Sequence, residues 1–288
     1  MKMMLIALIP ILFAVPLYLL SQYQIGNYNN QLSCRYKTYG DPARDTIVLG
    51  PGLDGVTAFF TDIVPELTMN HHVVVYNLPL CSRGCNESEY TFQFIANDLK
   101  DVVDELKLEK VTLVGESFGG IIAQHFALQY SERLDKLVLL SSLAKTILPA
   151  EIQWKLDNLM PIISTFGYYY PNFAQFLFAQ IHVDDVVEPF ESNEVRQLFI
   201  KEASFAHFYS VLARIKITSK LDILNEISNI TTPTLVIYGE DDHFTKKDSL
   251  QLQSRLANAN IMSLPGGHLA HLSSPKQFAH LVHSFIVN

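Results

Sequence analysis

Charge is scarce in this sequence, and positive charge is the scarcer sign. Only 17% of the 288 residues are charged, and 21 Lys and Arg stand against 29 Asp and Glu, which gives a formal net charge of -8. No segment is rich in Lys or Arg. Because phosphate binding needs a concentrated basic surface, the composition disfavours nucleic acid as a partner.

Cysteine is scarce as well. The three cysteines, Cys34, Cys81 and Cys85, are too few for a disulfide scaffold and lack the paired spacing of a zinc site. The sequence therefore gives no support for a structural metal. In an exported protein Cys81 could pair with Cys85, and separate thiols are the alternative.

Apolar residues, by contrast, make up 49% of the chain, which is enough for a globular core. The run from Met3 to Leu20 carries no charge and follows Lys2. Its length falls between a signal-peptide core and a membrane span of roughly 20 residues, and no small-x-small cleavage site closes it. We predict that residues 1–22 are an uncleaved anchor, so that the membrane is a partner and the location. A cleaved signal of a secreted protein and a buried first helix are the alternatives.

Beyond this run, short β-branched segments alternate with helical periodicity. The segments lie at residues 46–49, 73–76, 111–114, 137–140, 234–238 and, more weakly, 261–264. Between two of them, Ile95, Leu99 and Val102 repeat at the spacing of one helix face. The alternation predicts an α/β fold with a mostly parallel central sheet flanked by helices.

Residues 143–221 interrupt the alternation. They are mostly helical in pattern, rich in Phe and Tyr, and contain no good buried strand. We interpret them as an insertion between residues 32–142 and 222–288. The aromatic side chains either form a small helical core or line an apolar cavity, and both interpretations stay open.

The motif G-x-S-x-G, formed by Gly115, Ser117 and Gly119, lies directly between a predicted strand and a predicted helix. A serine on such a sharp turn has a strained backbone, and side chains two residues before and after it would collide with the neighbouring chain. Glycine removes those side chains. The turn would project the hydroxyl beside a helix amino terminus, which favours developing negative charge.

With this motif, the chain from Leu32 to Asn288 resembles the α/β-hydrolase superfamily, particularly its single-domain lipase, esterase and acyl-hydrolase branch with a helical cap. The resemblance implies residues 143–221 as the cap and a Ser-acid-His triad in chain order, without a cofactor. Asp242, in the loop Gly239-Glu-Asp-Asp, matches the acid, and His268, after Gly267, matches the base. His268 would take the Ser117 proton while Asp242 orients the ring. His271 is the alternative base.

The same resemblance implies an oxyanion hole of two backbone amides. Phe118, the residue after the nucleophile, matches one donor, and Leu53 matches the other. Pro51 stands where the family usually has histidine. We expect Asp54 to point outward as the turn residue before Gly55, because a carboxylate pointing inward would oppose an anionic intermediate.

The stretch of Gly50, Gly52 and Gly55 also spells the dinucleotide fingerprint G-x-G-x-x-G. That fingerprint expects an acidic residue at the end of the second strand, where this chain has Asn77. It also leaves Ser117 without a role. We therefore predict no cofactor.

Together these features predict a serine hydrolase that cleaves an apolar ester, thioester or amide through an acyl-enzyme. The expected substrate is an apolar small molecule or a lipid ester. Two alternatives stay open: an acyltransferase or perhydrolase with the same triad, and a non-enzymatic, ligand-binding member of the fold. The sequence makes no prediction of the oligomeric state.

Overall fold

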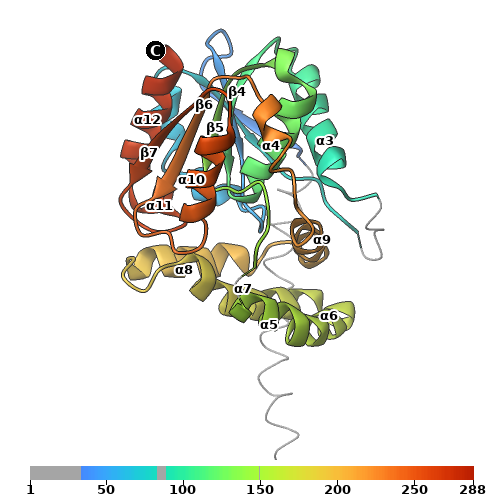
Figure 1. The fold of residues 1–288 in the computed structure, drawn as a ribbon. Coiled ribbons are helices and arrows are strands. Elements are labelled where there is room, and N and C mark those ends of the chain that lie inside the picture. The colour runs from blue at the N-terminus through green and yellow to red at the C-terminus, as the bar shows by residue number, and fades with distance from the viewer. Residues whose placement is uncertain (1–33, 83–88, 149) are drawn as a thin grey trace, which may run out of the picture.

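The computed structural model describes residues 34–82, 89–148 and 150–288. These residues form a seven-stranded sheet at the centre of the molecule (Figure 1), in the order β1-β3-β2-β4-β5-β6-β7. The strands are β1 (Tyr36–Tyr39), β2 (Thr46–Gly50), β3 (His72–Tyr76), β4 (Val111–Glu116), β5 (Leu134–Leu140), β6 (Thr234–Gly239) and β7 (Ala259–Leu264). All neighbours pair in parallel except β1, which runs antiparallel to β3. The predicted fold class is confirmed.

Helices cover both faces of the sheet (Figure 1). One face packs against α3 (Phe92–Glu105), α4 (Phe118–Gln129) and α10 (Lys246–Arg255). The other face packs against α2 (Val64–Thr68) and α12 (Pro275–Val287). Because both faces are covered, strands β2, β3 and β4 are buried along their whole length, as parallel strands usually are.

Helix α3 illustrates how the sequence specifies these elements. Its apolar residues Ile95, Leu99 and Val102 are buried against the sheet, as their spacing predicts. Thr91 precedes the helix, and its side chain accepts a hydrogen bond from the Phe94 N–H, which satisfies one of the free amides of the first turn.

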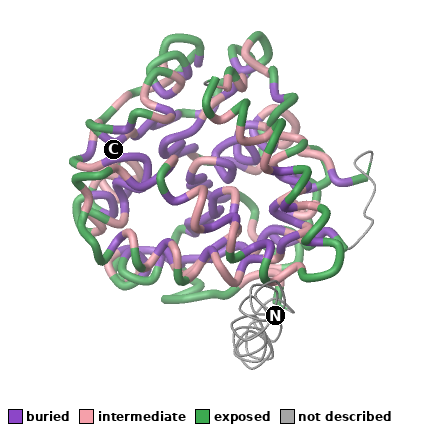
Figure 2. Tube along the Cα trace, turned by 90° about the horizontal axis from the view of Figure 1, so that it is seen from below, coloured by how far each residue is buried: buried purple, intermediate pink, exposed green. Residues whose placement is uncertain are grey.

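A row of helices joins β5 to β6. They are α5 (Ala150–Asn158), α6 (Met160–Tyr169), α7 (Pro171–Val186), α8 (Asn193–Ala203) and α9 (Phe208–Thr218). In Figure 1, α5 to α8 form a layer across one end of the sheet. Seen from that end, exposed residues follow the outline of the molecule and buried residues gather inside it (Figure 2). A short helix, α11 (Ala270–Ser273), precedes α12.

The predicted membrane anchor needs correction. Residues 1–22 lie outside the described residues. Of the part of the chain that the structure describes, no helix has both the length and the apolar character to cross a membrane. The predictions of a transmembrane helix, of a membrane-anchored location and of the membrane as a partner thus find no support in any helix that the structure describes.

The cysteines differ in state. Cys81 is disulfide-bonded, whereas Cys34 is a free, exposed thiol. The third cysteine, Cys85, lies outside the described residues.

Candidate active site

Ser117 occupies the turn between β4 and α4, and its backbone has a φ of 51°. A non-glycine residue with positive φ is uncommon and persists only where the surroundings enforce it. The surroundings are backbone atoms: a Cβ at Gly115 would lie 2.4 Å from the Gly119 carbonyl oxygen, and a Cβ at Gly119 would lie 2.3 Å from the Gly50 carbonyl oxygen. The two glycines therefore permit the close approach that raises the serine above the end of β4.

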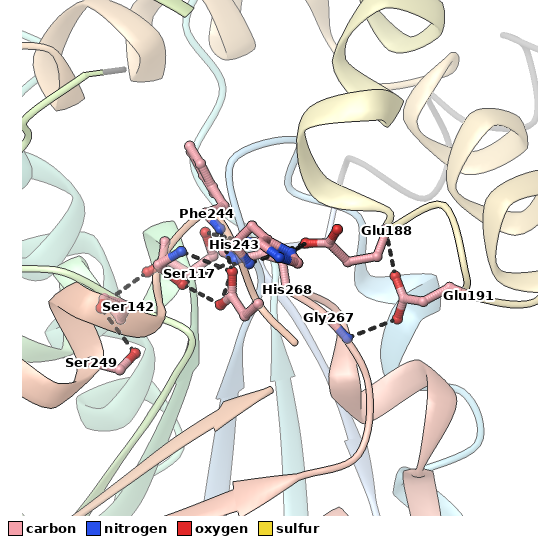
Figure 3. A network of polar contacts seen from close by, with 11 residues as sticks. Ser117, Ser142, Glu188, Glu191, His243, Phe244, Ser249, Gly267 and His268 are labelled. Atoms are coloured by element: carbon pink, nitrogen blue, oxygen red, sulfur yellow. Dashed lines mark hydrogen bonds and ion pairs between the residues drawn. The ribbon is translucent and has the colours of Figure 1, made fainter. Parts of the chain in front are cut away.

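Ser117, His268 and Asp242 meet at the carboxyl ends of β4 and β6. In the sequence, His268 is 151 residues from Ser117 and 26 residues from Asp242. His268 Nε2 lies 3.0 Å from Ser117 Oγ, and His268 Nδ1 lies 3.4 Å from Asp242 Oδ2. Figure 3 shows Ser117 and His268 pointing toward one another. The order serine, histidine, carboxylate is the one that a triad requires.

Thr245 connects the acid and the base. Its hydroxyl donates to Asp242 Oδ2 at 2.6 Å and lies 3.1 Å from His268 Nδ1. The other Asp242 oxygen accepts the N–H groups of Phe244 and Thr245, both at 2.8 Å. These donors fix the carboxylate, so the direction in which it faces the imidazole is set by its own loop.

The charges of the pair are complementary. Burial disfavours the Asp242 carboxylate, but the charge and hydrogen bond of His268 and the donors from Thr245 outweigh it and lower the pKa of Asp242 to about 2. Burial likewise disfavours a charged His268, and nearby carboxylates, Asp242 first, raise its pKa nonetheless. An imidazolium that forms after proton transfer is therefore stabilised.

His271, the alternative base, lies in the hydrophobic core. It is wholly buried, with its ring 6.0 Å from the rings of Phe60 and Phe278, and neither ring nitrogen has a hydrogen-bond partner among the described residues. Burial and the neighbouring His268 lower its pKa to about 3. His271 is a neutral core residue and makes no contact that a catalytic base needs.

The loop after β2 lies over the serine. Leu53 and Ser117 line the same small pocket, and Phe118 is the first residue of α4, a position whose amide has no acceptor one turn earlier in a helix. The Gly52 N–H donates to Glu116 Oε2 at 2.6 Å, and the Leu53 carbonyl accepts from the buried Arg214 guanidinium at 3.0 Å. Glu116 and Arg214 thus hold the loop from two sides.

Asp54 does not point outward, so that prediction is wrong. Its side chain is buried and lines the pocket of Ser117, and its Oδ1 has no hydrogen-bond partner among the described residues. Burial raises its pKa, although the charges of His182 and Arg214 oppose the rise. A raised pKa favours the neutral carboxyl, which opposes an oxyanion far less than a carboxylate would.

The glycine-rich loop is also unsuited to a dinucleotide. A Cβ at Gly52 would lie 2.6 Å from Glu116 Oε2, and a Cβ at Gly55 would lie 2.7 Å from an Arg214 nitrogen. The space that the fingerprint keeps for a pyrophosphate is thus filled by side chains of this chain, and the Gly52 amide already binds a carboxylate.

Two adjoining cavities lie near the site, and Ser117 lines the first of them. The first is a small pocket lined by Ser117, His268 and residues of α7 and α8. The second is larger and lies between α5, α6, α7 and α9. Leu53 and His182 line both. Apolar side chains dominate the second cavity, among them Leu156, Met160, Ile163, Phe178 and Ile215.

The motifs alone do not reveal Thr245, Glu116, Arg214, Glu188 or Glu191. Thr245 stands three residues after Asp242, so its place in the same loop is a signal in the sequence that its hydroxyl could contact the acid. Glu116 is adjacent to the nucleophile, but its partner Gly52 is 64 residues away. Only the fold brings such pairs together.

The chain matches known proteins over most of its length. A model of the alpha/beta hydrolase fold matches residues 45–177. The protein named "Putative carbamate hydrolase RutD" of Pseudomonas syringae pv. syringae is 26% identical over 84% of this chain and 93% of its own. The 2-hydroxy-6-oxononadienedioate/2-hydroxy-6-oxononatrienedioate hydrolase 2 of Pseudomonas putida is 27% identical over 88% and 92%.

Solved structures agree on the fold. The enol-lactonase of Burkholderia xenovorans LB400 superposes with a TM-score of 0.75 at 17% identity, over 88% of this chain and 96% of that one. Together, the matched residues, the relatives and the shared architecture show that the chain is a hydrolase with the α/β-hydrolase fold.

Proposed function

We propose that the chain is a serine hydrolase that cleaves an apolar ester, or a related thioester or amide, through an acyl-enzyme. The observation that supports this most directly is the 3.0 Å contact between Ser117 Oγ and His268 Nε2, with Asp242 behind the ring. A serine hydroxyl is a weak nucleophile at its own pKa and needs such a base.

In the first half of the proposed reaction, Ser117 Oγ attacks the substrate carbonyl carbon and His268 Nε2 takes the hydroxyl proton. The carbonyl oxygen becomes an oxyanion, for which the Leu53 and Phe118 amides are the proposed donors. When the bond to the leaving group breaks, His268 returns the proton to it. Asp242 keeps the ring oriented and stabilises its cation throughout.

In the second half, water replaces the leaving group. His268 takes a proton from the water, whose oxygen attacks the acyl carbon, and then returns that proton to Ser117 Oγ as the acid departs. The net reaction consumes one water and restores every residue.

The preference for an apolar substrate is supported by the second cavity, which shares Leu53 and His182 with the pocket of Ser117 and is mostly apolar in its lining. The names of the relatives include carbamate and dienedioate hydrolases, and the latter substrate carries two carboxylates. Lys155, the cation in this cavity, already pairs with Asp185 at 2.6 Å. The lining therefore favours an apolar chain over a dicarboxylate.

In this proposal the helical residues 143–221 serve as a cap, with residues 32–142 and 222–288 forming the hydrolase core. The support is that α5, α6, α7 and α9 line the larger cavity and α7 and α8 line the pocket of Ser117.

The proposal is tested with p-nitrophenyl esters from acetyl to octanoyl. Each added methylene that enters the cavity should raise kcat/KM up to about fourfold, from roughly 0.8 kcal/mol of burial, until the space is full. Ser117→Ala and His268→Ala should each lower kcat/KM by about a thousandfold or more, with a smaller loss allowed for Asp242→Ala.

Two results would count against the proposal. Undiminished turnover in Ser117→Ala would exclude the acyl-enzyme, and a steady fall of kcat/KM from acetyl to octanoyl would exclude the apolar pocket.

A further inference from the structure

Glu191, on the segment that joins α7 to α8, contacts the loop that carries the base of the triad. The Gly267 N–H donates to Glu191 Oε1 at 3.2 Å, and the Ser273 hydroxyl donates to the same oxygen at 2.9 Å. Gly267 directly precedes His268 in the chain. Figure 3 shows Glu191 reaching Gly267 from the helical segment. The carboxylate thus holds the backbone on which the catalytic imidazole is mounted.

Glu188, on the same segment, contacts the loop that carries the acid. The His243 N–H donates to Glu188 Oε1 at 3.1 Å, and His243 Nδ1 lies 3.1 Å from that oxygen. His243 directly follows Asp242. The Glu188 N–H in turn donates to Glu191 Oε2 at 2.9 Å, so that the two glutamates form one connected unit (Figure 3).

The contact is close-packed as well as polar. The Glu188 side chain is only 13% exposed, although its charge would favour water. A Cβ at Gly267 would lie 2.4 Å from Glu188 Cγ, so only a glycine lets the segment approach the backbone before His268 so closely. The burial and close packing of Glu188 indicate that the role of its side chain is to contact the loops of Asp242 and His268.

Glu191 also acts on His268 by its charge. Burial lowers the pKa of His268. The charge and hydrogen bond of Asp242, followed by the charges of Glu116 and Glu191, more than offset this effect. His271, the other titratable group beside it, is neutral. Glu191 therefore favours the imidazolium that the reaction forms after the serine proton is taken.

We propose that Glu191 and Glu188 are positioning residues through which the helical segment completes the triad: Glu191 holds the loop of His268, and Glu188 holds the loop of Asp242. This inference rests on the proposed serine mechanism. Its consequence is that the catalytic geometry depends on both the helical segment and the sheet, and not on the sheet alone.

The test compares Glu191→Ala, Glu191→Gln and wild type. In Glu191→Ala, kcat should fall at least about tenfold with KM within about twofold, because a small displacement of a catalytic group has a large effect on rate. The acid limb of kcat/KM should move to lower pH, since one charge that favours protonated His268 is gone. Glu191→Gln keeps an acceptor for the Gly267 N–H, so kcat should recover largely while the limb stays at the lower pH.

The matched control is Glu194→Ala, which removes an exposed carboxylate three residues away. It should leave kcat, KM and the acid limb unchanged. Hydrogen exchange of the peptide that contains Gly267 gives a readout independent of activity, and should accelerate in Glu191→Ala but not in the control.

The inference is overturned if Glu191→Ala keeps wild-type kcat and acid limb, or if Glu191→Gln loses as much activity as Glu191→Ala without moving the limb. The latter is what a general loosening of the fold would give. Ser117→Ala is measured alongside: equal turnover there and in wild type would refute the serine mechanism, while hydrogen exchange would still report on the contact.

Discussion

At the scale of single residues, the carboxyl groups around the His268 imidazole differ in the direction in which their pKa is shifted. Asp242 is held ionised by four neighbouring donors and charges, with its pKa lowered to about 2. Among the described residues, the Glu116 side chain accepts a hydrogen bond only from the Gly52 N–H. Burial raises the pKa of Glu116 to about 7, although the charge of His268 and the Gly52 hydrogen bond lower it. The environment, not the residue type, thus decides which carboxyl group is a permanent anion.

Glu116 has a stability cost that depends on pH. A carboxyl group whose pKa rises from 4.5 in the unfolded chain to about 7 in the fold destabilises the fold progressively as pH rises through that window, by up to about 3 kcal/mol. Glu116→Gln keeps an acceptor for Gly52 without the charge. It should raise the melting temperature by several degrees at pH 8 and leave it unchanged at pH 4.

Calorimetry measures the melting temperature at the two pH values. Glu109→Gln, which changes an exposed carboxylate between α3 and β4, is the control that should alter the melting temperature at neither pH. A Glu116→Gln variant less stable at pH 8 than at pH 4, relative to wild type, would show that the ionised carboxylate stabilises the fold.

The sequence predicts Ser117, Asp242 and His268 because each follows a strand in a short loop with its own pattern of neighbours. It does not predict Glu191, whose contact with Gly267 spans 76 residues, and it predicts the wrong orientation for Asp54. A turn tendency is a local property, whereas the burial of Asp54 comes from α7 and α9, which supply His182 and Arg214.

At the scale of elements, the turn from β4 to α4 is tightly constrained, because both flanking glycines face backbone atoms that cannot move aside. The strands β2 to β7 are predicted from their β-branched runs. The sequence of β1, Tyr-Lys-Thr-Tyr, carries no such run, because an edge strand that is mostly exposed needs no apolar face.

Glycine substitutions measure the constraint. Gly115→Ala and Gly119→Ala would place a Cβ 2.4 Å and 2.3 Å from carbonyl oxygens, and each should lower the free energy of unfolding by about 3 kcal/mol or more, or prevent folding. Gly50→Ala is the matched control, because its Cβ would meet nothing nearer than 3.8 Å.

Urea unfolding of the three variants provides the measurement. If Gly50→Ala lost as much stability as the other two, the loss would come from glycine content and not from the close approach at the turn.

At the scale of the whole molecule, the proposed reaction divides between two parts. Loops at the carboxyl ends of the strands supply the proposed triad. The segment between β5 and β6 supplies most of the apolar cavity and the two glutamates that contact the loops of His268 and Asp242. The sequence predicts the presence and the helical nature of this segment. Its cavity depends on how α5, α6, α7 and α9 pack together, which no local pattern encodes.

Filling the cavity should separate substrates by length. Leu156 lines it from α5, and Leu156→Trp should lower kcat/KM for the octanoyl ester about tenfold or more while leaving the acetyl ester nearly unchanged, because only the longer chain needs the space. Ile162→Trp, at a position 57% exposed on α6, is the control. Equal losses for both esters in Leu156→Trp would mean that the acyl chain lies elsewhere.

Covalent labelling tests most directly whether Ser117 is a nucleophile that His268 activates. A fluorophosphonate probe, followed by mass spectrometry of the digested protein, should add one phosphonyl group to the peptide that contains Ser117. We expect rapid labelling in wild type, none in Ser117→Ala and labelling slowed by about a thousandfold in His268→Ala. Labelling of a different residue, no labelling of wild type, or an unchanged rate in His268→Ala would contradict this mechanism.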